Sequence, residues 1–116
     1  MVAEAQEAYD TFLTTVAIPL TRQVANILKA EGLGFTVSTP QSGLRLASDK
    51  SRDDYLEFAL DATGDAPVVL GRVRRTRGSR TLEDERPVGG GKPPASLTDD
   101  DVLALLTDAL DALIQR

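Results

Sequence analysis

The spacing of the apolar residues changes once along the chain, and this change most constrains the fold. Before Gly34, apolar residues recur at steps of three and four, which is the period of one face of an α-helix. After Gly34 they alternate with polar residues, which is the two-residue period of a strand with one buried face. The sequence therefore predicts an α+β domain in which an N-terminal helix precedes a sheet.

The first segment predicts a long amphipathic helix over about residues 3–31, and Gly32 supplies the left-handed residue just past its end. Pro19 cannot donate a hydrogen bond to the carbonyl of Thr15, so we expect the helix to be kinked near Pro19. The alternative is that two shorter helices meet there, with Pro19 in the first turn of the second. A straight helix would be about 42 Å long, which exceeds the diameter of roughly 35 Å expected for a compact domain of this size. A kink resolves this overhang, and packing of one half against a second copy of the chain is the alternative.

Five segments carry the two-residue alternation of strands. They cover about residues 35–39, 44–48, 55–61, 68–76 and 81–88. The connections between them are rich in turn residues, as at 40–43 and 49–54, and they are too short for parallel crossovers. We therefore expect a five-stranded antiparallel meander.

A second helix is predicted over 98–115, after a connector at 89–97. Thr98 is a good N-cap, and Asp101 occupies the acidic position of a capping box. The apolar face of this helix is broad, so it contacts either the sheet and the first helix together, or a second subunit. We expect one domain, residues 1–116, with both helices packed on one face of the sheet.

The order of helix, five antiparallel strands and helix resembles the layout of small dimeric chaperone and adaptor domains, such as the bacterial type III secretion chaperones. The resemblance concerns element order alone, because no sequence motif carries it. The helix that those chaperones have between their third and fourth strands has no counterpart in this sequence. The resemblance implies a homodimer that binds a protein partner.

The composition excludes several kinds of chemistry. The chain has no cysteine and no histidine, which removes disulfides, thiolate nucleophiles, imidazole bases and the usual zinc and copper ligands. Glu57 and Asp61 would lie about 13 Å apart on a strand, too far to act as a carboxylate pair. Helix capping accounts for the acidic run 99–101. We therefore expect no catalytic residues, no cofactor and no metal.

The densest local pattern in the sequence is basic. Five arginines fall within nine residues without an intervening acid: Arg72, Arg74, Arg75, Arg77 and Arg80. A turn at Gly78-Ser79 would place Arg74 opposite Glu83 and Arg72 opposite Glu85, and such cross-strand pairs would partly neutralise the arginines. No aromatic residue is interleaved for stacking on bases. Binding of nucleic acid or another polyanion is therefore the less favoured function of this hairpin.

The same register places Arg75, Asp84 and Arg86 on the side of the sheet that should meet the helices. Buried charges are costly unless they are paired. Three interpretations are open. The side chains lie at a solvated or sheltered end of the sheet, the register is shifted by one residue, or an Arg-Asp-Arg cluster forms a polar pocket or subunit contact.

The favoured function is that of a non-enzymatic protein-binding, adaptor or chaperone-like domain that acts as a homodimer. The alternatives are binding of a polyanion and binding of a small molecule between sheet and helices. The net charge is −5, which disfavours coating of nucleic acid or anionic membrane by the whole surface. No apolar run approaches the roughly 18 residues that a membrane span needs. We therefore expect no membrane partner and a cytoplasmic location.

Overall fold

The computed structural model describes residues 2–40 and 43–114. Its helical elements are α1 (Val2–Phe12), the π-helical turn η1 (Leu13–Ala17), α2 (Ile18–Ala30), two short 3-10 turns, η3 (Val88–Gly91) and η4 (Pro94–Ser96), and α3 (Asp99–Ile114). Its strands are β1 (Phe35–Ser38), β2 (Leu44–Ser48), β3 (Tyr55–Asp61), β4 (Val68–Arg77) and β5 (Arg80–Pro87). The predicted α+β fold is confirmed. Part of the predicted turn at 40–43 and the predicted helix end at 115 lie outside the described residues.

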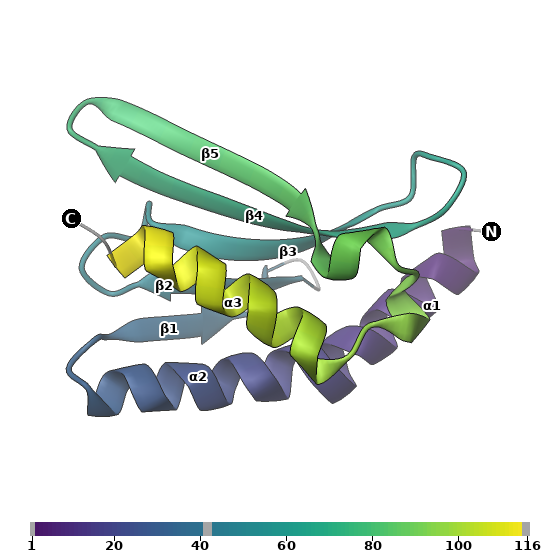
Figure 1. The fold of residues 1–116 in the computed structure, drawn as a ribbon, viewed down its shortest axis with the longest axis horizontal. Coiled ribbons are helices and arrows are strands. Elements are labelled where there is room, and N and C mark those ends of the chain that lie inside the picture. The colour runs from purple at the N-terminus through teal and green to yellow at the C-terminus, as the bar shows by residue number, and fades with distance from the viewer. Residues whose placement is uncertain (1, 41–42, 115–116) are drawn as a thin grey trace.

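The sheet has the order β1-β2-β3-β4-β5, with each strand antiparallel to its neighbours (Figure 1). The meander is therefore confirmed, and β1 and β5 are its edges. Gly78 has a φ of +66°, which at the first position of a two-residue hairpin turn is typical of a type II′ turn. The predicted register of this hairpin is confirmed, because Arg74 lies opposite Glu83 and Arg72 lies opposite Glu85.

The N-terminal helix accommodates Pro19 without a gap in helical structure. Helical residues run from α1 through η1 into α2, where Pro19 lies in the first turn. The N–H of Ile18 donates to the carbonyl of Leu13, five residues earlier, which is the bond of a π-turn. The hydroxyl groups of Thr14 and Thr15 donate to carbonyl oxygens in the preceding turn. The chain thus stays helical past Pro19, and a bend of the helix axis there remains a prediction.

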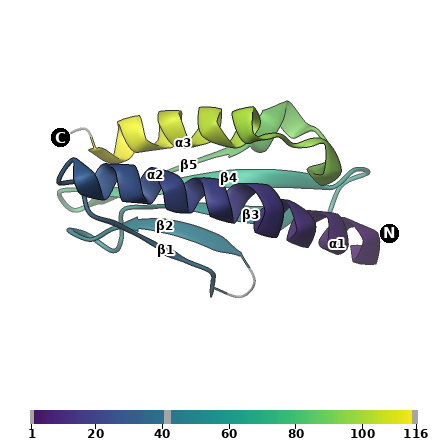
Figure 2. The ribbon, with the colours of Figure 1, turned by 90° about the horizontal axis from the view of Figure 1, so that it is seen from below.

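Every part of this helix contacts other elements of the same chain. α1 contacts η4, η1 contacts α3, and α2 contacts β1, β2 and α3. The body measures 41 × 30 × 24 Å, and the helix runs along its length beside the sheet (Figure 2). The expected overhang assumed a rounder body. An elongated one accommodates the helix without a second copy of the chain.

The core lies between the helices and the central strands. Leu46 and Leu56 are almost fully buried, and both occupy one cross-strand row with Val73 and Asp84. Exposure increases along this row, because Val73 is half-buried and Asp84 is exposed. α3 contacts β4, whereas most of β5 is exposed along its length. The cover provided by the helices therefore ends before the β5 edge.

The broad apolar face of α3 is used within the chain. It buries Val102, Leu105, Leu106, Ala109, Leu110 and Leu113. The helix contacts α2, η1, η3 and β4, so contact with both the sheet and the N-terminal helix accounts for this face. Among the residues that the structure describes, three large apolar side chains are exposed, all on α2 or α3: Ile27, Leu103 and Ile114.

The start of α3 has the capping box that the sequence predicts. The N–H of Thr98 donates to Asp101 Oδ2 at 2.9 Å, and the N–H of Asp101 donates to Thr98 Oγ1 at 3.3 Å. Lys92 Nζ lies 2.8 Å from the same Asp101 oxygen, and this contact, followed by the Thr98 N–H, lowers the pKa of Asp101. The predicted connector at 89–97 contains η4 and most of η3, and its glycines Gly89, Gly90 and Gly91 all have positive φ angles.

Tyr9 carries a buried hydroxyl that is costly to the fold. The residue is 4% exposed, and its hydroxyl has no hydrogen-bond partner among the described residues. Burial, with smaller contributions from Asp10 and Glu57, raises the pKa of Tyr9 to about 12. An unsatisfied buried donor costs about 1–3 kcal/mol. We expect Tyr9→Phe to raise the free energy of unfolding by about 1 kcal/mol at neutral pH.

The same substitution should alter the response to alkali. The native state holds the Tyr9 proton more tightly than the unfolded chain, whose tyrosine has a pKa near 10.0. The stability that this proton contributes is present below pH 10 and is lost as the pH rises towards 12. Urea unfolding should therefore show that the free energy of unfolding of Tyr9→Phe exceeds that of the native protein by more at high pH than at neutral pH. Tyr55→Phe is the matched control, and an equal alkaline gain in that variant would contradict this account.

Candidate functional site

The face of the sheet away from the core carries a row of alternating charges. The row crosses four neighbouring strands, and each of its residues lies opposite the next: Arg45, Glu57, Arg72 and Glu85. Arg45 Nη2 lies 2.5 Å from Glu57 Oε2, and Arg72 Nε lies 2.5 Å from Glu85 Oε2. The bond to Glu85 also raises the pKa of the Arg72 guanidinium. The predicted pair of Arg72 with Glu85 is confirmed, and exposed pairs of this kind stabilise by about 0–1 kcal/mol.

Arg74 lies on this outer face, opposite Tyr55 on one neighbouring strand and Glu83 on the other. The Tyr55 hydroxyl, and more weakly the charge of Glu83, raise the pKa of the Arg74 guanidinium. The ring of Tyr55 also lies 4.2 Å from the guanidinium carbon of Arg45, a cation–π contact. The sequence register places Arg74 and Glu83 correctly, but it does not identify the tyrosine on the other neighbouring strand.

Arg75 and Arg77 bind the C-terminal turn of α3. Arg75 Nη1 donates to the carbonyl of Ala112 at 3.1 Å, and Arg77 Nη2 donates to the same oxygen at 3.2 Å. Arg77 Nη1 also lies 3.7 Å from Asp54 Oδ2. The last carbonyls of a helix lack partners within the helix, and nearby positive charge is favourable there. The two arginines therefore hold α3 against the hairpin.

The five arginines do not form one continuous basic surface. Arg72 and Arg74 lie on the outer face with partners, Arg75 and Arg77 reach α3, and Arg80 is exposed beside the turn. Four of these five arginine side chains thus interact with groups of the same chain. A polyanion would meet a surface that also carries Glu57, Glu83 and Glu85.

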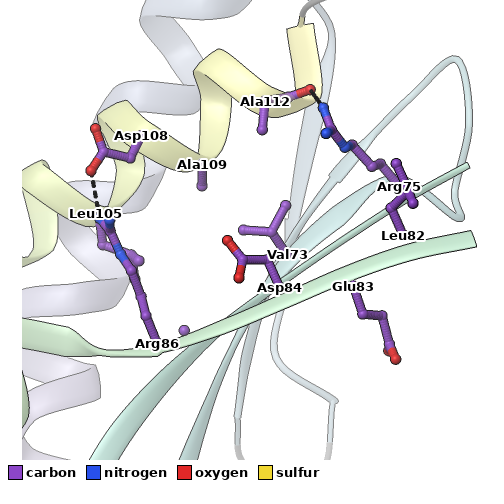
Figure 3. A pocket seen from close by; sticks show the side chains of 11 residues that line it. Val73, Arg75, Leu82, Glu83, Asp84, Arg86, Leu105, Asp108, Ala109 and Ala112 are labelled. Atoms are coloured by element: carbon purple, nitrogen blue, oxygen red, sulfur yellow. Dashed lines mark hydrogen bonds and ion pairs between the residues drawn. The ribbon is translucent and has the colours of Figure 1, made fainter.

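A pocket lies between the β4–β5 hairpin and α3 (Figure 3). Its volume is about 270 Å³. The residues that line it are Gly71, Val73, Arg75, Leu82, Glu83, Asp84, Arg86, Leu105, Asp108, Ala109 and Ala112. Arg75, Asp84 and Arg86 thus line one pocket, but Asp84 and Arg86 are also exposed, so the polar-pocket and the solvated-edge interpretations both remain predictions. The one-residue register shift is wrong.

The arginines of this pocket pair with α3 rather than with Asp84. Arg86 Nη2 lies 2.8 Å from Asp108 Oδ2, and it also donates to the carbonyl of Ala104 at 3.4 Å. Arg75 reaches the carbonyl of Ala112 at the other end of the pocket (Figure 3). Asp84 points into the space between these two side chains. Among the described residues its carboxylate forms no ion pair or hydrogen bond, so the expected Arg-Asp-Arg contacts do not form.

Sequence reasoning missed the wall of the pocket that α3 supplies. Leu105, Asp108, Ala109 and Ala112 line it, and they recur at the three-to-four spacing of one helix stripe. This stripe lies at the border of the apolar face, where small and charged residues replace leucine. The sequence shows the helical spacing of these residues. It does not show which strands the stripe packs against.

One border of the pocket is an unpaired strand edge. In a two-residue hairpin the residues that flank the turn exchange main-chain hydrogen bonds, and every second pair does so along the ladder. The Arg77–Arg80 and Val73–Asp84 pairs belong to this bonded set. The residues between bonded ones on β5, namely Thr81, Glu83 and Glu85, therefore direct their N–H and C=O groups to the open edge. Pro87 continues this series, as expected of proline at an edge.

Comparison of the chain with protein-family models, with curated protein sequences and with solved structures found no significant match. Within residues 2–40 and 43–114, no group of three or more acidic side chains is placed to hold a metal ion. In the same residues, no helix combines the length and apolar character needed to cross a membrane. The geometry of the pocket and of the β5 edge is therefore the basis for a functional proposal.

Proposed function

We propose that this chain is a non-enzymatic protein-binding domain that binds an extended segment of a partner as an added strand on β5. The observation that carries the proposal is that β5 is an eight-residue edge strand whose open side borders the pocket against α3. In strand addition, main-chain hydrogen bonds supply affinity, and pockets for alternate side chains supply specificity. This edge and this pocket offer both.

The main-chain groups and the pocket beside β5 favour an extended peptide segment over the surface of a folded partner. Thr81, Glu83 and Glu85 offer three consecutive sets of outward main-chain groups, as the hairpin register implies. Side chains of an added strand alternate between its two faces, so every second one would project to the side of the sheet that bears α3, next to the opening of the pocket. Leu82 and the α3 stripe supply an apolar lining there.

A second copy of the chain is the competing occupant of this edge. Antiparallel self-pairing near the middle of β5 would bring Glu83, Asp84 and Glu85 opposite the same three acids. Like charges directly opposite one another on neighbouring strands are destabilising. We therefore propose a different protein as the partner at β5.

Homodimer formation remains a separate prediction, with Ile27, Leu103 and Ile114 as the exposed apolar side chains available to it. Light scattering at low and high salt tests it. A mass near twice 12.4 kDa at both salt concentrations would support the dimer, and a mass near 12.4 kDa would contradict it. Strand addition to β5 requires neither state.

The test of the proposed function removes one outward N–H group without breaking the β4–β5 ladder. A random library of displayed short peptides is selected on the native protein, and the dissociation constants of recovered peptides are measured. We expect Glu83→Pro to abolish their binding, because proline has no N–H and its ring obstructs an adjacent strand. Glu83→Ala is the matched control, since it removes the same carboxylate but keeps the N–H.

Urea unfolding of both variants establishes that the fold is retained, as expected for substitution at an exposed edge position. Tight binding of the recovered peptides to Glu83→Pro would overturn strand addition at β5. Failure to recover any peptide above the background of the library would also overturn it. Equal loss in Glu83→Ala and Glu83→Pro would show that the carboxylate, and not the main chain, binds the peptides.

A further inference from the structure

We propose that the strand bound at β5 is a basic one and that it inserts a lysine or arginine side chain into the pocket beside Asp84. This inference rests on the proposed function and names the chemistry of its partner. Three observations support it. They are the carboxylate of Asp84, which has no partner among the residues that the structure describes, the apolar part of the pocket lining, and the acidic run 83–85 on β5.

The first observation concerns the charges in the pocket. Both arginines that flank Asp84 are engaged with α3, Arg75 at the Ala112 carbonyl and Arg86 at Asp108. Asp84 lies between them with its carboxylate directed into the pocket (Figure 3). A carboxylate can accept bonds at two oxygens, and ammonium and guanidinium groups are its strongest donors. Arg75 keeps its charge, because its acceptor is a neutral carbonyl, but the lining holds three acids against two arginines. The excess negative charge and the free oxygens of Asp84 therefore favour a cation.

The second observation concerns the shape and lining of the pocket. Its volume of about 270 Å³ lies just below the range of about 300–1,000 Å³ for small-ligand pockets, and it suits a single long side chain. Val73, Leu105 and Ala109 line its inner part. Lysine and arginine bury their aliphatic stems along apolar surface while the charged group remains near water or a partner. Such a side chain matches both the apolar lining and the carboxylate at the rim.

The third observation concerns register. Asp84 shares the core-facing side of the sheet with Val73, and a residue directly opposite it on an added strand would have its Cβ about 4.5–5.5 Å away. That residue would project onto the same side, towards α3. Glu83 and Glu85 flank Asp84 on β5 and add negative charge along the edge. An acidic segment would be repelled at this position, and a basic one would be attracted.

The test is a comparison of peptide selections on variants of the full chain. The same random library is selected on the native protein, on Asp84→Asn, on Asp84→Lys and on Glu83→Pro. We expect native recoveries to share one position enriched in lysine and arginine, and we expect this enrichment to be lost with Asp84→Asn. With Asp84→Lys, the same position should favour aspartate and glutamate. For a single recovered basic peptide, Asp84→Asn should lower the affinity by up to about fivefold, the upper limit for one cross-strand charge pair.

The outcomes separate the inference from the proposed function. Recovered peptides that need the Glu83 N–H but have no position enriched in lysine and arginine would overturn the inference of a basic side chain. Peptides that keep this enrichment when selected on Asp84→Lys would overturn it too. Both outcomes would leave strand addition intact. Peptides that bind Glu83→Pro as tightly as the native protein would overturn strand addition itself. Because Asp84 is exposed and has no partner within residues 2–40 and 43–114, its variants should fold. Their urea midpoints check this, and Asp84→Asn, the smaller change, is decisive if Asp84→Lys is unstable.

Discussion

Replacing Leu106 by alanine is expected to lower the free energy of unfolding by about 2–5 kcal/mol, because the substitution leaves a cavity at the centre of the core. Leu106 is 1% exposed and belongs to the cluster that joins α3 to the sheet and the N-terminal helix. Leu103→Ala is the matched control, since Leu103 lies on the same helix but is 44% exposed. Urea unfolding followed by circular dichroism measures both effects.

The control should lose much less stability, because an exposed leucine loses little burial on truncation. Comparable losses in Leu106→Ala and Leu103→Ala would contradict the packing of α3 described above. They would indicate that the face bearing Leu103 is buried in solution, as in a dimer formed through that face.

Replacing Gly71 by valine is the second substitution with a large expected effect, a loss of about 1–3 kcal/mol from overpacking. Gly71 lies on β4 beneath α3, and a Cβ at this position would lie 2.5 Å from Leu105 Cδ2 and 3.2 Å from Leu105 Cγ. Because Leu105 is 3% exposed, its side chain has little space to move. We expect α3 to be displaced, which would also widen the pocket.

Gly64→Val is the control for this substitution, because a Cβ at Gly64 would meet no atom within 4 Å. A double-mutant cycle with Leu105→Ala tests the contact directly. The cost of Gly71→Ala should be smaller in the Leu105→Ala background than in the native one. Strict additivity of the two costs would contradict the close approach of Leu105 to β4.

The sequence predicted the features that depend on local chemistry or on short-range register. Thr98 and Asp101 form the predicted capping box because both partners lie within one helical turn. The turn at Gly78-Ser79 determines the β4–β5 register and hence the pairing of Arg72 with Glu85. These predictions needed no knowledge of how the helices pack.

The candidate site was predicted only in part, because its other half is distant in sequence. Register alone placed Arg75, Asp84 and Arg86 on one side of the sheet. Their partners depend on where α3 lies, and the carbonyl that binds Arg75 is 37 residues away. Every residue has a main-chain carbonyl, so no pattern in the sequence identifies that of Ala112 as an acceptor.

The measurement that most directly tests binding at the β5 edge is amide hydrogen exchange, residue by residue, with and without a library-selected peptide. In the free protein, the N–H groups of Thr81, Glu83 and Glu85 should exchange fast, because they face the open edge. Those of Leu82 and Asp84 should exchange slowly, because they bond to β4.

Binding of the peptide is expected to slow exchange at Thr81, Glu83 and Glu85. Leu82 and Asp84 should remain protected in both states. If the three outward amides continue to exchange fast in the complex while protection appears at β1 or on a helix face, the binding surface lies elsewhere and the account is contradicted.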